Sequence, residues 1–437
     1  MQESDLRRSA LKIRVLDDDA NLRDGWVNQI KTASGESDVE GLNWDSDDQE
    51  VVVLESRRRS FLDSQADATK VYSDTDRSVF DDVDLLFVDY KLFADTSDPK
   101  KRRLTGLELA YLIRAYSKCK VIVALNSQGG FMRAQRHFDL TLRDASERIE
   151  NLHITSGDLV NPGLWRLPDA AREDYRPWVW PLFSDEVSKH DARLAQARTL
   201  LDDASESKFL VDLLGFDQEE RYSVPAFAID HLGREGLEAT ANDFLWYSGN
   251  VVRGDDFEIE HDRRKAEDRS KNLSKARTSL PCIRLFAAAI HRWLERMVIP
   301  NLDVLIDRPH LLMRWPGLLS EAAEDAGRLT DWARSGMGSA VPADELEAYR
   351  FNNDCWLSRP AYWWSRLQRD EKLASRVKAA SRAIRSKLVF QEDTSRFASS
   401  DSSVRFRCNF PSTTATRFLA GPDKFKDINY EPASRLA

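Results

Sequence analysis

The sequence predicts an α/β domain built on a doubly wound parallel sheet, followed by a mostly α-helical domain. Short apolar runs alternate with helical patterns over the first third of the chain, as in a parallel sheet covered on both faces. Acidic residues directly follow two of these runs, and amphipathic helical patterns dominate from about residue 165 onward. We expect an α/β domain over residues 1–165, a mostly helical domain over 166–391, and a polar tail over 392–437 with a short strand in Val404–Phe410.

The expected strands of the first domain are five short apolar runs: Leu11–Leu16, Val51–Leu54, Val83–Val88, Lys120–Leu125 and Leu152–Thr155. Apolar residues spaced three and four apart predict a helix after the first strand, with Leu22, Trp26, Val27 and Ile30 on one face. Gly106–Tyr116 is a second amphipathic helix. Residues 34–50 are acidic and contain Gly and Ser, so we expect a loop there.

The second domain is expected to consist mainly of helices. Arg176–Phe183, rich in Pro and Trp, predicts a connector, and three long helical stretches follow it: Ser184–Ala204, Pro281–Val298 and Pro360–Val389, the last holding one or two helices. The stripe formed by Leu285, Ala288, Ala289, Trp293 and Met297 predicts one buried face. No repeat with a period of 20–50 residues is present, so a solenoid is not expected.

The composition narrows the class of protein. The chain has 437 residues with a formal net charge of −9, which gives no bulk attraction to nucleic acid or to an anionic membrane. It contains no run of about 18 apolar residues, the length that would indicate a membrane span. Its 4 cysteines are widely scattered without metal-binding spacing, so neither a zinc site nor a disulfide framework is predicted. We expect a cytoplasmic protein.

Carboxylates follow two of the predicted strands. Asp17 and Asp18 come after the first strand, and Asp89 comes after the third. Because the carboxyl ends of parallel strands meet at one edge of the sheet, these groups are expected to form a negative site. Oxygen ligands of this kind suit Mg²⁺, and a carboxylate beside Mg²⁺ can attack phosphorus. Asn126 and Ser127, at the end of the fourth strand, are placed to donate a hydrogen bond to a phosphoryl oxygen.

Four stretches in order resemble the receiver domain of two-component response regulators: IRVLDDDANLRDG at 13–25, VDLLFVDYKL at 83–92, TGLELAYLIR at 105–114 and KVIVALNS at 120–127. The resemblance covers roughly residues 10–160 and implies a flavodoxin-like sheet. It implies that Asp17 and Asp18 hold Mg²⁺ and that Asp89 is the phosphoacceptor. The backbone carbonyl of Lys91 would join the metal ligands. Asn126 falls where receivers usually carry Thr or Ser, with Ser127 as a substitute.

The resemblance implies a signalling protein that accepts a phosphoryl group from a partner histidine kinase and has no separate enzymatic activity. The stretch RWLERMVIPNLDVLIDRPHLLMRWPGLL at 292–319 is similar to the C-terminal halves of receiver proteins in bacterial conflict operons, including Detocs-type three-component antiviral phosphorelays. That similarity implies a second partner, an effector protein of the same operon.

Departures from the receiver pattern leave two alternatives open. The segment between Asp89 and Gly106 is longer than in most receivers and carries the basic run Lys100–Arg103. The stretch near the end of the fifth strand, ITSGDLVNPGLW, has no counterpart of the family lysine. The missing lysine and the Asn at the Thr/Ser position, Asn126, favour a phosphorylation-independent docking protein that keeps only the receiver fold. The other alternative is an enzyme within the helical half, such as a metal phosphohydrolase using His261–Asp262, but the spacing of His231, His291 and His310 does not favour it.

Overall fold

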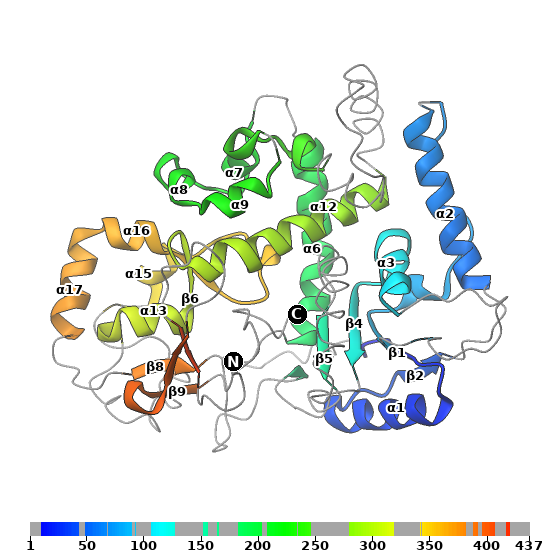
Figure 1. The fold of residues 1–437 in the computed structure, drawn as a ribbon, viewed down its shortest axis with the longest axis horizontal. Helices are drawn as coiled ribbons and strands as arrows, with labels where there is room; N and C mark the ends of the chain where they lie inside the picture. The colour runs from blue at the N-terminus through cyan, green and yellow to red at the C-terminus, as the bar shows by residue number, and fades with distance from the viewer. Residues whose placement is uncertain are drawn as a thin grey trace, which may run out of the picture.

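The computed structural model describes residues 10–42, 49–67, 69–89, 92, 106–126, 152–155, 164–165, 182–202, 208–233, 235–245, 279–318, 341, 343–381, 388–391, 396–406 and 417–419. A parallel sheet with helices forms the first part, and helices with two small sheets form the second (Figure 1). Over these ranges, no helix combines the length and the apolar character that crossing a membrane requires.

The first sheet confirms the α/β prediction. Its strands, in chain order, are β1 (Ile13–Leu16), β2 (Val39–Leu42), β3 (Leu85–Asp89), β4 (Val121–Asn126) and β5 (Leu152–Thr155). The spatial order is β2-β1-β3-β4-β5, and all neighbouring strands are parallel. The central strand β3 is apolar and buried along its length up to Asp89, because a parallel sheet covered on both faces excludes water from both sides of its inner strands.

The second strand lies elsewhere than predicted. Val51–Leu54 was expected to be a strand, but it belongs to the helix α2 (Gln49–Ala66). The buried side chains Val51, Leu54 and Phe61 recur at helical intervals, and a four-residue apolar run cannot by itself distinguish a strand from a helix. Strand β2 instead arises within residues 34–50, which were expected to be a loop. It is an edge strand in which only Val39 is buried, so its apolar signal is weak.

Helices cover the two faces of the sheet. Helix α1 (Ala20–Ser34), predicted from its apolar spacing, and α6 (Phe183–Asp202) share one hydrophobic core with β1, β3 and β4. Helices α2 and α3 (Gly106–Tyr116) pack on the opposite face. In the first core, the ring of Phe183 lies 5.7 Å from Phe87 and 4.8 Å from Trp165. Helix α6 was assigned to the second domain from the sequence, yet it closes one face of this sheet.

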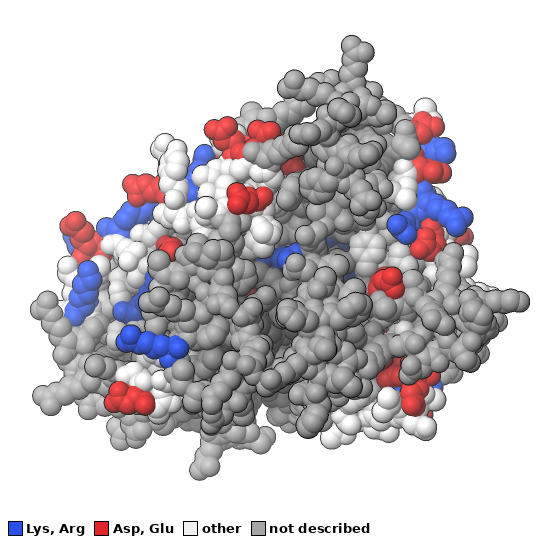
Figure 2. All heavy atoms as spheres, viewed as in Figure 1, with Lys and Arg blue, Asp and Glu red and all other residues white. Residues whose placement is uncertain are grey.

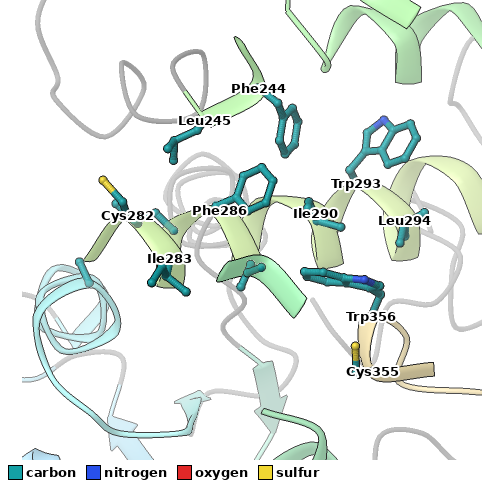
Figure 3. Close-up of a cluster of buried hydrophobic side chains, with 14 of the residues drawn as sticks. Phe244, Leu245, Cys282, Ile283, Phe286, Ile290, Trp293, Leu294, Cys355 and Trp356 are labelled. Carbon is teal, nitrogen blue, oxygen red and sulfur yellow. The ribbon is translucent and has the colours of Figure 1, made fainter. Parts of the chain in front are cut away.

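The long helix of the second part is α12 (Leu280–Trp293), which continues into a π-helical turn at Leu294–Val298. Figure 3 shows its apolar face, where Phe286 meets Phe244 and where Trp356 lies beside Ile290. The helices predicted at Ser184–Ala204 and Pro281–Val298 are thus confirmed. The shorter helices are α7 (Leu210–Leu213), α8 (Gln218–Ser223), α9 (Ala226–Asp230), α13 (Arg308–Arg314), α15 (Ala343–Glu347), α16 (Trp364–Arg369) and α17 (Glu371–Ser381). The single 3-10 turns are Val79–Asp82, Gly236–Glu238, Ile299–Asn301, Pro316–Leu318, Asp354–Trp356 and Ser400–Ser402.

Two small sheets accompany these helices. Strands β6 (Leu305–Asp307) and β7 (Ala361–Trp363) form an antiparallel pair. The other sheet has the order β10-β11-β8-β9, from β8 (Leu388–Gln391), β9 (Arg396–Ser399), β10 (Val404–Phe406) and β11 (Arg417–Leu419). Strand β10 is the short strand expected within Val404–Phe410. The others were not predicted, because three or four residues are too few to show an alternating pattern.

A buried charge network joins the π-helical turn to β6 and β7. The guanidinium of Arg359 lies 3.3 Å from the Glu295 carboxylate and 3.2 Å from that of Asp307. Asp307 also contacts His310 Nδ1 at 2.5 Å. All four side chains are buried. Burial raises the pKa of Glu295, but the charge of Arg359 and the hydrogen bonds from Ser358 outweigh it, so the pKa of Glu295 is lowered. The contact between Glu295 and Arg359 is therefore an ion pair, and the network holds these segments together.

Charged side chains of both signs alternate on the visible surface. Figure 2 shows Lys and Arg next to Asp and Glu over α2, and again over α16 and α17. Some of these neighbours are ion pairs: Arg366 and Arg369 of α16 lie 2.7 and 3.3 Å from the buried Glu220 of α8. These pairs hold α8 against α16.

Candidate metal centre

The ends of β1 and β3 bring the predicted acidic residues together. The two strands are adjacent and parallel, with Leu16 paired to Val88, so the next residues along, Asp17 and Asp89, lie side by side at the carboxyl edge. This register is observed over four residue pairs, from Ile13 with Leu85 to Leu16 with Val88. The sheet thus positions two of the three predicted carboxylates directly.

The three carboxylates Asp17, Asp18 and Asp89 form one cluster, in which one oxygen of each lies within 4.8 Å of the others. Asp17 is buried, Asp89 is half-buried and Asp18 is exposed. The cluster is thus fixed on its inner side and open to solvent through Asp18. Among the described residues, this is the one group of three or more His, Cys, Asp or Glu side chains with metal-ligand spacing.

Hydrogen bonds hold Asp17 in a single orientation. Its Oδ1 accepts from the backbone N–H of Asp19 at 2.9 Å, and its Oδ2 accepts from the indole Nε1 of Trp26 at 3.2 Å. Burial raises the pKa of Asp17, the two donors lower it, and the charges of Asp18 and Asp19 raise it, for a net upward shift. Because its surroundings disfavour the anionic form of Asp17, a nearby cation would stabilise that form.

Asp19 has a separate role, because it is the N-cap of α1. Its Oδ1 accepts from the backbone N–H groups of Asn21 and Leu22 at 2.8 and 3.2 Å. This satisfies donors that a helix otherwise leaves without partners at its first turn. The three consecutive aspartates therefore divide into two cluster members and one helix cap.

The cluster fits Mg²⁺ in ligand type. Mg²⁺ takes hard oxygen ligands at about 2.0–2.1 Å in octahedral geometry, so neighbouring ligand oxygens lie about 3.0 Å apart and opposite ones about 4.2 Å apart. Oxygens at the observed limit of 4.8 Å would have to approach by up to about 1.8 Å to share one ion. Two like charges at this separation repel by about 0.9 kcal/mol in bulk water and about 3.5 kcal/mol at an effective dielectric of 20. A divalent cation would convert this repulsion into attraction.

The other predicted site residues are described only in part. Asn126 ends β4 at the same edge, one residue beyond the pairing of Leu125 with Asp89, and its side chain lies outside the described part of the chain. Lys91 and Ser127 also lie outside the described residues, as does His261–Asp262.

The histidines considered for a metal enzyme have other contacts. His291 Nδ1 lies 2.7 Å from the carbonyl of Trp356, and His310 belongs to the Asp307 network. These positions do not form a ligand group with each other within the described residues.

Trp26 donates a hydrogen bond to the cluster, a role that the sequence did not predict. Its helical spacing predicted a core residue, and its ring does pack against the core shared with Val27 and Ile30. The signal that could have identified it is chemical, since a half-buried indole N–H normally has an acceptor.

Comparisons with protein families, with curated proteins and with solved structures found no match for this chain.

Proposed function

We propose that this chain is a response-regulator-like signalling protein in which Asp89 accepts a phosphoryl group from a phosphohistidine on a partner histidine kinase. The observation that carries the proposal is the cluster of Asp17, Asp18 and Asp89 at the carboxyl edge of the sheet. The strand order β2-β1-β3-β4-β5 supports it, because this doubly wound order is that of flavodoxin-like and receiver folds. In such sheets, ligands bind outside the carboxyl ends of the strands.

The reaction is an in-line transfer. A carboxylate oxygen of Asp89 attacks phosphorus, the new P–O bond forms as the P–N bond to the kinase histidine breaks, and the imidazole nitrogen keeps the electron pair and takes up a proton. Asp17, Asp18 and Asp89 would hold Mg²⁺, which neutralises charge on the phosphoryl oxygens. The hydrogen bonds from Asp19 and Trp26 keep Asp17 oriented before the ion arrives.

Three further residues enter the proposal through the resemblance to receivers. The backbone carbonyl of Lys91 would complete the metal ligands, and Asn126 or Ser127 would donate to a phosphoryl oxygen. The position of Asn126 at the end of β4, beside β3, is consistent with that role.

The test is phosphoryl transfer measured by intact mass. Wild-type protein is incubated with acetyl phosphate or a phosphorylated histidine kinase, with and without Mg²⁺. We expect one added phosphoryl group that requires Mg²⁺ and is lost in Asp89→Asn. The matched control is Asp84→Asn, which removes a carboxylate just before the opposite end of the same strand, and we expect it to be phosphorylated normally. Equal labelling of Asp89→Asn would refute the assignment of the acceptor.

The second candidate function is a docking protein that keeps the fold but is never phosphorylated. The specific observation in its favour is the absence of a lysine from the stretch ITSGDLVNPGLW, which begins with the last two residues of β5. Mg²⁺ binding without any added mass from several donors would favour this function over phosphotransfer.

The identity of the partners is a separate proposal. The similarity of residues 292–319 to receiver proteins of antiviral phosphorelays favours a kinase and an effector encoded in the same operon. Transfer from the neighbouring kinase should then be faster than transfer from an unrelated kinase at equal concentration. Equal rates would argue against a dedicated relay.

A further inference from the structure

Helix α3 connects the edge of the sheet that carries the acidic cluster to the second half of the chain. Strand β3 ends at Asp89, and in a strand–helix–strand unit the following helix runs back along the sheet, so α3 begins at Gly106 on the carboxyl edge. It ends at Tyr116 on the opposite edge, where the chain turns into β4. The 11 residues of α3 span about 16 Å at 1.5 Å per residue.

Arg284 of α12 donates hydrogen bonds to carbonyls at the C-terminal end of α3. Its Nε donates to the carbonyl of Arg114 at 2.6 Å, and its Nη2 donates to the carbonyl of Cys119. The side chain is 2% exposed, so the guanidinium is held inside the contact between the two halves. Carbonyls at a helix C-terminus have no partners within the helix, and a cation there is also favoured by the helix dipole.

The packing around Arg284 is continuous. Leu109, Leu112 and Ile113 of α3 belong to the same hydrophobic core as Ile283 and Phe286 of α12, and α12 packs on α6 as well. Figure 3 shows Cys282 and Ile283 at the end of α12 that approaches the α/β half. The outward face of α3 is thus occupied by the chain itself.

We infer that the state of the acidic cluster is transmitted within the chain to α12 through α3, with Arg284 as the residue that couples the two halves. The inference rests on the proposed phosphorylation of Asp89. Phosphorylation of a carboxylate adds negative charge at the edge where the positive end of α3 lies. A shift of α3 cannot be absorbed at its far end, because Arg284 and the shared core tie that end to α12, and close-packed interfaces move as units.

A second arginine provides a matched control. Arg57 of α2 donates to the carbonyl of Tyr116 at 2.8 Å, at the same end of α3, and pairs with Asp81 at 2.7 Å. Both Arg57 and Arg284 are buried and both bind carbonyls at the α3 C-terminus. Arg57, however, comes from the α/β half, so its removal loosens the same helix end without breaking a link to α12.

The experiment is hydrogen–deuterium exchange of the full chain with and without acetyl phosphate and Mg²⁺, with the phosphorylated fraction read by intact mass. In the wild type, we expect phosphorylation to change the exchange rates of α12 amides by about fivefold or more, the lower end of typical coupling between sites. Arg284→Met should become phosphorylated but lose this change, and Arg57→Met should retain it.

The outcomes separate the two proposals. Absence of added mass refutes the proposed function and with it the coupling. Full phosphorylation with unchanged α12 exchange in the wild type refutes the coupling alone, as does an equal loss of the response in Arg57→Met. If Arg284→Met does not fold, Arg284→Lys replaces it, because a lysine keeps the charge but cannot reach both carbonyls with a planar fork. A full response in that variant would also overturn the assignment to Arg284.

Discussion

The acidic cluster should destabilise the protein when no cation is bound. Asp17 is buried at the end of β1, and Asp89 is half-buried beside it at the end of β3. Replacing Asp89 with Asn keeps the shape of the side chain and removes one of the three charges. We therefore expect Asp89→Asn to raise the stability of the metal-free protein while it weakens the response to Mg²⁺.

The magnitude follows from the separation of the carboxylate oxygens. At the 4.8 Å limit, removing the Asp17–Asp89 repulsion stabilises the protein by about 0.9–3.5 kcal/mol, depending on the effective dielectric. For a cooperative unit of 437 residues, this corresponds to a rise in Tm of roughly 1 °C per kcal/mol. In the wild type, Mg²⁺ at about ten times its dissociation constant adds about 1.4 kcal/mol.

The assay is thermal unfolding at pH 8, well above the ordinary pKa of a carboxyl group, with EDTA or with increasing Mg²⁺, supported by calorimetric titration of Mg²⁺. The control is Asp24→Asn, which removes an exposed carboxylate from α1 that is not part of the cluster. We expect a higher Tm in EDTA and a reduced Mg²⁺ effect only for Asp89→Asn. A lower Tm of Asp89→Asn in EDTA, or an undiminished Mg²⁺ effect, would show that the carboxylates do not act as one site.

Three further predictions concern the rest of the fold. Arg359→Met leaves Glu295 and Asp307 buried without their cation, and we expect a loss of about 3–5 kcal/mol in the free energy of unfolding, measured with urea against the exposed control Arg405→Met. Burial opposes the lowered pKa values of Asp81 and Glu295, but their arginine partners outweigh it. These two carboxylates therefore stabilise the folded protein fully above their unfolded pKa values, and this stabilisation is lost as the pH falls. The urea concentration at the unfolding midpoint should decrease once the pH is below about 4.5; an unchanged midpoint from pH 5 to 3 would contradict this. Burial raises the thiol pKa to about 11 for Cys119, about 12 for Cys282 and about 11 for Cys355. A thiol reagent followed by peptide mapping should therefore label these three cysteines only after unfolding.

The α/β order and the location of the acidic cluster were predictable because their signals are local. Apolar runs of four to six residues mark β1, β3 and β4, and the aspartates follow two of them directly. In a parallel sheet, residues that follow neighbouring strands must meet at one edge. The position of β2 was predicted wrongly because its local signal is weak: only Val39 is buried in that edge strand. The stronger apolar run at Val51–Leu54 is compatible with a helix as well as with a strand.

The sequence by itself determined which carboxylates form the cluster and on which edge of the sheet they lie. Only the tertiary structure decided that Trp26 orients Asp17, that α6 closes the sheet, and that Arg284 joins α12 to α3. The physical reason is the range over which each signal acts. The apolar pattern of a strand or helix can be recognised from neighbouring residues in the sequence. The hydrogen bond between Arg284 and the carbonyl of Arg114, by contrast, joins positions 170 residues apart. An arginine in an amphipathic helix predicts solvent exposure until the partner carbonyls are known.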